Sequence, residues 1–481
     1  MPYKNKKSKI NILILLFIII ELFNILFAES VANIIITIPQ AIFVLFLIFN
    51  GKLEKACYFN ILFTVLCFNT DFGLTSNETI LSYAKIKVFG PFTLSYMLGG
   101  VIWVATVNKY TIIAPADSLF FKFYKTIKYL LVSGGLIGFM GVILWAYPLE
   151  YFIRPLVYIV NAYIYTDILL RFYSQDIVKK YQRTAFCLLV ASPIATSLSF
   201  FLFQVRGSYS VFEALITNEV YTYVPCLLII LLLGTKYKVQ ALVALFCYFL
   251  NLLAAARGAY YMTTAIAIVF CIYIIYFSKN SFSPRLSIAY KIVFPVIAIG
   301  ISVYGFINMS SEGMASQKLA QFLSLGNLFF QSGDYDFSPE TVSSSPFIRV
   351  GELVNIVYEG SYNPIGLLVG KGYGGYYIDD LRLFSMLDLS QGAFADDIAA
   401  SGKFRTAHSM LPSSILYNGL IGALLLIRLG IEYLKRITIS PFVYVAATLF
   451  FYSFYYDPLL IIVSILILFG AEYDLRFKNL Q

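Results

Sequence analysis

Apolar runs of about 16 to 22 residues recur along most of the chain and are separated by short polar stretches. A helix of this length crosses the hydrocarbon of a bilayer, and the runs lack the two-residue alternation of membrane barrel strands. The pattern therefore predicts a bundle of membrane helices. The expected spans are Ile10–Ala28, Val31–Asn50, Lys55–Thr70, Ile86–Val107, Thr126–Tyr147, Ile153–Leu170, Thr184–Gln204, Glu219–Gly234, Val239–Ala256, Gly258–Phe277, Ile288–Ile307 and Leu411–Leu429.

The last apolar stretch, Pro441–Gly470, is too long for one helix. It contains Asp457-Pro458, and a proline inside a helix removes a backbone hydrogen bond, so we expect two helices there. Hydrophobic residues make up 59% of the 481 positions and charged residues only 13%, a balance that soluble domains do not show. The predicted fold class is an all-α polytopic membrane protein with about 12 to 14 transmembrane helices.

The formal net charge of +9 would suggest a nucleic-acid partner in a soluble protein. In a membrane protein, however, Lys and Arg concentrate on the cytoplasmic loops. Four lysines precede a first span that we expect to be retained, because Glu29 replaces a small-residue cleavage site. Starting from a cytoplasmic N-terminus, 24 of the 35 Lys and Arg residues fall inside. Topology therefore accounts for the charge, and no nucleic-acid partner is expected.

A long polar segment, 308–410, interrupts the spans and contains eleven Asp and Glu against six Lys and Arg. This acidic balance favours the outer side of the membrane, and loops of such length usually carry function or are disordered. The spacing of apolar residues predicts short loop helices at Met314–Phe330 and from Pro346 to about Tyr358. The chain is thus divided into membrane helices 1–307, one large extracytoplasmic loop 308–410 and C-terminal membrane helices 411–481.

Two features of this loop could carry chemistry. Arg349 and Glu352 are three residues apart on one helix face, so the carboxylate can orient the guanidinium, although a plain surface pair has the same spacing. The run Gly370–Gly375 has the GxGxxG spacing but lacks the strand-to-helix context of a dinucleotide site, and no Lys-Ser or Lys-Thr makes it a P-loop. We expect a tight turn with exposed backbone amides near Lys371.

Two more polar residues lie where a span should meet the outer surface. Arg257 lies in a very short hairpin between two spans, so its guanidinium should lie at the outer membrane–water boundary. It could carry chemistry there or simply bind lipid phosphate. His408 is the only histidine and directly precedes the span that begins near Leu411. A lone histidine is more often structural than catalytic.

The six cysteines all fall inside apolar runs without a CxxC pair, so neither a disulfide nor a metal centre is expected. The acidic pairs Asp379-Asp380 and Asp396-Asp397 could at most hold a hard cation weakly. The prediction is therefore a protein without a metal or another cofactor.

Two features of the spans are interpreted as structural. Gly134, Gly138 and Gly141 form a stripe of small residues that would allow helices to pack closely. Glu21 inside the first span should pair with a polar neighbour.

In order and topology, several of these features resemble the O-antigen polymerase and O-antigen ligase family, mainly over residues 240–430. The family usually has Ser where this chain has Ala256 and Asn where it has Ser409, and such short motifs do not separate polymerases from ligases. The residues that carry the resemblance are Arg257-Gly258, Arg349, Gly370-Lys371-Gly372-Tyr373-Gly374, and His408 ahead of Gly419-Leu420-Ile421-Gly422.

The resemblance implies a glycosyltransferase C-like membrane fold with one large periplasmic loop. The implied reaction is metal-independent transfer of a glycan from an undecaprenyl-diphosphate-linked donor to a sugar hydroxyl of a lipid-linked acceptor. It would take place at the periplasmic face of the bacterial inner membrane and need no cofactor. The implied partners are the lipid-linked donor and acceptor, the bilayer and a chain-length regulator.

A diphosphate leaving group suits guanidinium donors, and the acceptor hydroxyl needs a general base. The resemblance therefore assigns Arg257 and Arg349 to the diphosphate and His408 to the base. A protonated His408 could instead bind the diphosphate, in which case Glu352 would be the base. The residues expected to bind substrate are Lys371, Gly372, Tyr373, Gly374 and Arg405.

Three other functions remain open. An O-antigen ligase would transfer the glycan to lipid A-core. A flippase or other transporter of lipid-linked oligosaccharide should place cations within its spans, whereas Lys and Arg gather here at loops. A non-catalytic scaffold of an envelope complex is the third. We favour a polymerase, because a long loop suits recognition of both donor and acceptor glycans.

Overall fold

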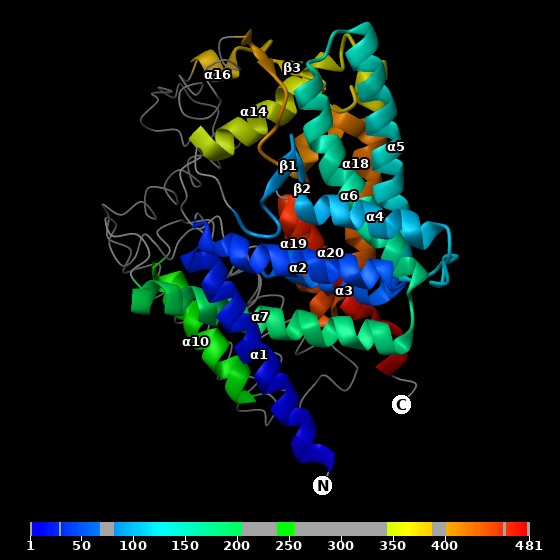
Figure 1. The fold of residues 1–481 in the computed structure, drawn as a ribbon. Helices are drawn as coiled ribbons and strands as arrows, with labels where there is room; N and C mark the ends of the chain where they lie inside the picture. The colour runs from blue at the N-terminus through cyan, green and yellow to red at the C-terminus, as the bar shows by residue number, and fades with distance from the viewer. Residues whose placement is uncertain are drawn as a thin grey trace.

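The structure is a computed structural model that describes residues 2–27, 30–67, 81–203, 238–254, 344–386, 401–455 and 458–478. Helices dominate these residues (Figure 1). The N-terminal helices are α1 (Pro2–Leu26), α2 (Ala32–Phe49), α3 (Leu53–Val65), α4 (Leu94–Val107), α5 (Leu119–Leu144), α6 (Leu149–Arg171), α7 (Gln175–Phe203) and α10 (Lys238–Ala254). The later elements are α14 (Ser344–Glu359), α15 (Pro364–Val369), α16 (Leu383–Met386), α18 (Met410–Ile437), α19 (Pro441–Ser453), α20 (Pro458–Glu472) and the π-helical turn η4 (Tyr473–Phe477).

Five of the described helical segments are long and apolar enough to cross a membrane. They are α2, α5, α6, α18 and α20 together with η4. The chain is therefore an all-α membrane protein, as the apolar pattern predicts. The predicted spans Glu219–Gly234, Gly258–Phe277 and Ile288–Ile307 and the loop helix Met314–Phe330 lie outside the described residues. The total of about fourteen spans thus stays a prediction.

One predicted span begins later than its apolar pattern suggests. The first residues of Ile86–Val107 form a short antiparallel hairpin of β1 (Lys87–Phe89) and β2 (Phe92–Thr93), and α4 begins only at Leu94. The cause is Gly90-Pro91, since Gly90 adopts a left-handed conformation with φ of 52° and Pro91 has no amide hydrogen to continue a helix. Apolar composition alone did not reveal this turn.

The predicted break near Asp457-Pro458 is confirmed, because α19 ends at Ser453 and α20 begins at Pro458. The two helices pack against each other, and α20 also contacts α3, α5, α6 and α7. In the apolar stretch that α20 forms together with η4, 89% of the residues are buried inside the protein. This helix is therefore the centre of the bundle, which explains why it is hydrophobic on all sides.

Two acidic side chains inside the bundle have hydrogen-bond partners on other helices or helix ends. Glu21 on α1 accepts hydrogen bonds from the Ser192 hydroxyl on α7 at 2.7 and 2.9 Å, which confirms the expected polar neighbour. The buried carboxylate of Glu472 accepts from the backbone amide of Phe120 at 2.8 Å and from the Tyr173 hydroxyl at 2.9 Å. Such bonds tie helices together where water is excluded.

The described part of the predicted loop lies at the end of the bundle where α5 and α6 are joined, at the top of Figure 1. It contains α14, α15, α16 and a second antiparallel strand pair of β3 (Tyr377–Ile378) and β4 (Lys403–Phe404). Tyr376, before β3, makes an edge contact with Tyr147 in the α5–α6 turn, their ring centroids 6.2 Å apart. This packing brings loop residues against the helix ends and defines the candidate site.

Candidate functional site

The glycine-rich turn after α15, residues 370–375, packs between α5 and α18. The backbone amides of Lys371 and Gly372 donate to the carbonyls of Leu416 and Tyr417 on α18, at 2.7 and 3.0 Å, and the amide of Tyr373 donates to Gly134 on α5 at 2.9 Å. The expectation of exposed amides here is therefore wrong. The α18 carbonyls can accept because the helix is interrupted at Gly419, whose φ of 67° breaks the regular hydrogen-bond ladder.

Glycine is required in this turn by both conformation and space. Gly370, Gly372 and Gly374 all have positive φ. A Cβ atom on Gly372 would lie 2.0 Å from the backbone nitrogen of Gly138, and one on Gly138 would lie 2.6 Å from that of Tyr373. The glycine stripe of α5 thus receives the turn, in addition to bringing α5 close to α6. The tertiary partner of this stripe was not evident from its spacing.

His408 and Glu352 form a hydrogen-bonded pair across two elements. Glu352 on α14 is fully buried, and its two oxygens accept from the ring Nδ1 of His408 at 2.7 Å and from the His408 backbone amide at 2.8 Å. The His408 side chain keeps 40% of its surface exposed. An ionised carboxylate only accepts hydrogen bonds, so when Glu352 is ionised and the imidazole is neutral, Nδ1 carries the proton and Nε2 has the lone pair.

The surroundings hold this pair in place. The Tyr377 hydroxyl donates to Glu352 Oε1 at 3.3 Å, and the Ser413 hydroxyl in the first turn of α18 donates to the Ala407 carbonyl at 3.1 Å. The imidazole is thus fixed at the start of α18 by a buried carboxylate, an arrangement that suits a general base.

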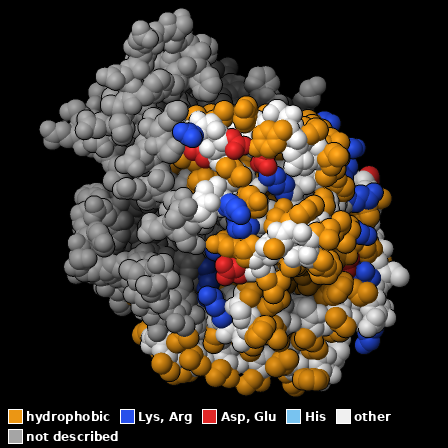
Figure 2. All heavy atoms as spheres, turned by 90° about the horizontal axis from the view of Figure 1, so that it is seen from above, with side chains coloured by type: hydrophobic (Ala, Val, Ile, Leu, Met, Phe, Trp, Pro, Cys, Tyr) orange, Lys and Arg blue, Asp and Glu red, His pale blue; other side chains and the backbone are white. Residues whose placement is uncertain are grey.

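Three cations surround the ring of Tyr376, and we call Lys371, Lys403 and Arg405 the cation cluster. Their charged groups lie 5.5, 5.1 and 5.2 Å from the ring centroid. Figure 2 looks onto this end of the molecule and shows Lys and Arg side chains gathered in the middle of the face, with acidic side chains beside them. The cluster is a positively charged patch that can attract an anion.

Each member of the cluster has contacts that position it. Arg405 donates to the Gly374 carbonyl at 2.9 Å and lies over the Tyr151 ring of α6 at 5.1 Å. Lys371 forms an ion pair with Glu359 and donates to the Tyr376 carbonyl at 2.6 Å. Burial and the nearby Tyr376 raise the pKa of Tyr147 to about 12, an effect that the charge of Arg405 partly opposes.

Several residues of this site were not selected from the sequence. Tyr417 on α18 donates to the Arg405 carbonyl at 2.7 Å and interacts electrostatically with both Glu352 and the exposed Arg154 of α6. Lys403, a member of the cluster, lies on β4, and Tyr376, whose ring the cluster approaches, directly precedes β3. An aromatic-rich composition gave no signal for these tyrosines, because aromatic residues are abundant throughout the chain.

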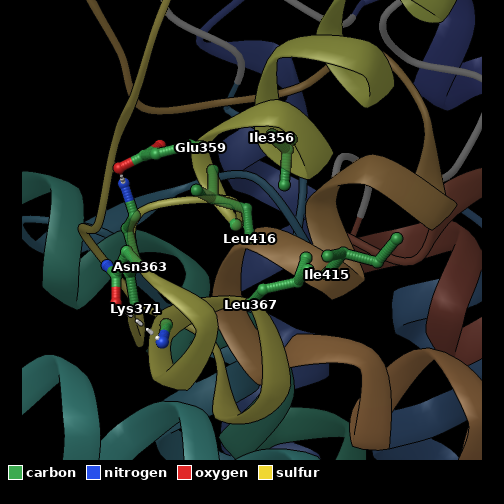
Figure 3. A pocket seen from close by; sticks show the side chains of 9 residues that line it. Ile356, Glu359, Asn363, Leu367, Lys371, Ile415 and Leu416 are labelled. Atoms are coloured by element: carbon green, nitrogen blue, oxygen red, sulfur yellow. Dashed lines mark hydrogen bonds and ion pairs between the residues drawn. The ribbon is translucent and has the colours of Figure 1, made fainter.

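A small pocket lies beneath the turn, between α14, α15 and α18 (Figure 3). Glu359 and Lys371 pair at its edge, and Leu367 faces Ile415 and Leu416 across it. It holds only about 10 Å³, the space of a single water-sized sphere, so a sugar cannot enter it in this conformation.

The structure separates other residues that the sequence grouped. Arg349 is exposed on α14, and among the described residues no hydrogen bond or ion pair joins it to Glu352, whose oxygens bind His408. In this conformation Glu352 is fully buried and bonded to His408, and its alternative role as the base stays a prediction. Gly372, Tyr373 and Gly374 are buried in the turn.

Other predicted residues are elsewhere. Arg257 lies outside the described residues, as does the pair Asp396-Asp397. Asp379 accepts from the first backbone amides of α16, and Asp380 accepts from the Tyr362 hydroxyl, so this acidic pair is engaged by the protein.

The fold and site define an α-helical membrane protein with a histidine–carboxylate pair and a cation cluster at one end of its bundle. No protein-family model matches the chain, and no curated protein sequence matches it either. The resemblance to O-antigen polymerases and ligases therefore rests on the short sequence motifs and their order alone.

Proposed function

We propose that this protein is a surface-polysaccharide polymerase of the bacterial inner membrane. It would transfer a glycan from an undecaprenyl-diphosphate-linked donor to the sugar hydroxyl of a lipid-linked acceptor, at a site facing the periplasm. In this proposal residues 308–410 form the large periplasmic loop and the helices form a glycosyltransferase C-like fold of about 12 to 14 spans.

The observation that carries the proposal is the bond between the exposed His408 imidazole and the buried Glu352 carboxylate. In the proposed reaction, Nε2 of His408 accepts the proton of the acceptor hydroxyl while its oxygen forms a bond to the anomeric carbon of the donor. The bond from that carbon to the diphosphate breaks, and its electron pair leaves with the diphosphate. Glu352 stabilises the imidazolium that forms.

The cation cluster supplies the second requirement, stabilisation of the departing diphosphate. Arg405 and Lys371 are held by the turn, and Lys403 lies 5.1 Å from the centroid of the Tyr376 ring that the other two also approach. Guanidinium and ammonium groups held beside the departing group favour the negative charge that develops in the transition state. Arg349 and Arg257 stay candidates for the same role.

The test is transfer by the purified protein in lipid nanodiscs, with lipid-linked donor and acceptor. His408→Ala should lower the rate about a hundredfold or more, the usual contribution of a positioned base, while donor binding is retained. Normal transfer by the variant would refute the assignment, and normal transfer with weaker donor binding would make His408 a diphosphate contact. Transfer to lipid A-core instead of the lipid-linked acceptor would identify a ligase.

A further inference from the structure

The segment between Glu359 and Lys371 has an unusual surface for an extramembrane loop. Its eleven residues, 360–370, carry no charge, and the two residues that flank it, Glu359 and Lys371, form an ion pair with each other. Within it, Ile365 and Leu368 on α15 are 74% and 50% exposed and, three residues apart, share one helix face. Tyr358 and Tyr362 are exposed next to them, and the Tyr362 hydroxyl donates to Asp380.

The position of α15 along the length of α18 indicates whether this exposed face lies at the level of the lipid. A Cβ atom on Gly419 would lie 2.2 Å from the Leu368 carbonyl oxygen, so α15 lies against α18 at that level. Gly419 is about 13 Å from the N-terminal end of α18 at 1.5 Å per residue. The part of α18 that follows the kink at Gly419, residues 420–437, measures only about 27 Å, which is less than the roughly 30 Å of the hydrocarbon core. If α18 spans the bilayer, the level of Gly419 and Leu368 therefore lies within the hydrocarbon.

At the level where α15 abuts α18, an exposed apolar face of α18 begins that is suited to contact lipid. Directly after Gly419, the exposed apolar residues of α18 follow the spacing of one helix face. They are Leu420, Leu424, Ile427, Ile431 and Leu434.

We propose that α15 is an interfacial helix, with Ile365 and Leu368 inserted among the acyl chains of the leaflet that meets the α5–α6 turn. Tyr358 and Tyr362 then lie at the headgroups, where amphipathic rings with one wet end are favoured. The glycine-rich turn, and with it Lys371, would thereby be held at a fixed depth in the membrane. The inference requires only that the protein spans a bilayer and is independent of the proposed reaction.

Photo-crosslinking to lipid tests this placement. Benzoylphenylalanine is placed at Ile365 or, separately, at Leu368, and the protein is irradiated in nanodiscs of phosphatidylethanolamine and phosphatidylglycerol. Leu424 on α18 is the lipid-facing control, and Ile378 on β3, an apolar residue 40% exposed in the same loop, is the control outside the membrane. Intact mass spectrometry measures the fraction of protein that gains one phospholipid.

We expect both α15 positions to crosslink lipid at a yield close to that of Leu424 and about tenfold above that of Ile378. Yields at both positions as low as at Ile378 would overturn the proposal. So would crosslinks from these positions to a second copy of the chain, which would make the face a protein interface.

Discussion

At the scale of single residues, burial assigns different roles to two groups that could each accept a proton. Glu352 is fully buried and bonds to His408 through both oxygens, whereas His408 is partly exposed. In the proposed reaction Glu352 is therefore a positioning residue, which would act on the substrate only through the imidazole.

Glu352→Gln tests this role. The side-chain amide of glutamine can donate to Nδ1, which would move the ring proton to Nε2 and leave the imidazole unable to act as base. We expect kcat to fall about a hundredfold with KM nearly unchanged, measured in the transfer assay. Glu150→Gln, at an exposed carboxylate near the start of α6, is the matched control and should keep full activity. A change in KM alone would contradict the positioning role.

At the scale of elements, the glycine-rich turn joins the loop to the bundle. Its amides replace the helical partners that α18 loses at Gly419, and its backbone lies on the glycine stripe of α5. The turn therefore determines where Lys371 and Arg405 lie relative to the helix ends, through the Lys371 backbone and the Gly374 carbonyl.

Gly372→Ala should damage this junction, because the added methyl group would lie 2.0 Å from the Gly138 nitrogen at a φ of 72°. We expect a loss of at least about 3 kcal/mol in the free energy of unfolding, seen as a lower Tm in detergent, because both contact and backbone are strained. Gly402→Ala is the matched control, since Gly402 also has a positive φ, 63°, but no atom within 4 Å of its Cβ position. Its cost should be about 1 kcal/mol. Equal losses in the two variants would show that the close contact with α5 is unimportant.

At the scale of the whole molecule, the proposed site requires the loop and the α5–α6 turn to be outside the cytoplasm. Both lie at one end of the bundle, and the α6–α7 corner lies at the far end of α6. The distribution of Lys and Arg predicts the first end to be outside and the second to be inside.

Cysteine labelling in intact cells checks this orientation. Ser361→Cys, exposed between α14 and α15, should react with a membrane-impermeant maleimide, while Ser174→Cys, exposed between α6 and α7, should be protected until the membrane is opened. The unsubstituted chain is the baseline, because its four described cysteines are buried or half-buried. The reverse pattern would place the histidine on the cytoplasmic side and rule out a periplasmic reaction.

The sequence by itself determined the class of protein and most helix positions. Long apolar runs leave no alternative to membrane helices, because unpaired backbone groups are too costly in lipid, and the split at Pro458 follows from proline geometry alone. It also identified His408 as a candidate, since a single histidine next to a predicted span can be recognised without knowing the fold.

Only the tertiary structure decided which groups meet. The spacing of Arg349 and Glu352 suggested a pair on one helix, but burial turned the carboxylate inward to His408, more than fifty positions away in the chain. The backbone amides of the glycine-rich turn were expected to be exposed, because their acceptors lie on distant elements, α5 and the kinked α18, which the local sequence does not reveal. Local periodicity describes the faces of one element at a time, whereas contacts between distant elements depend on how those faces pack.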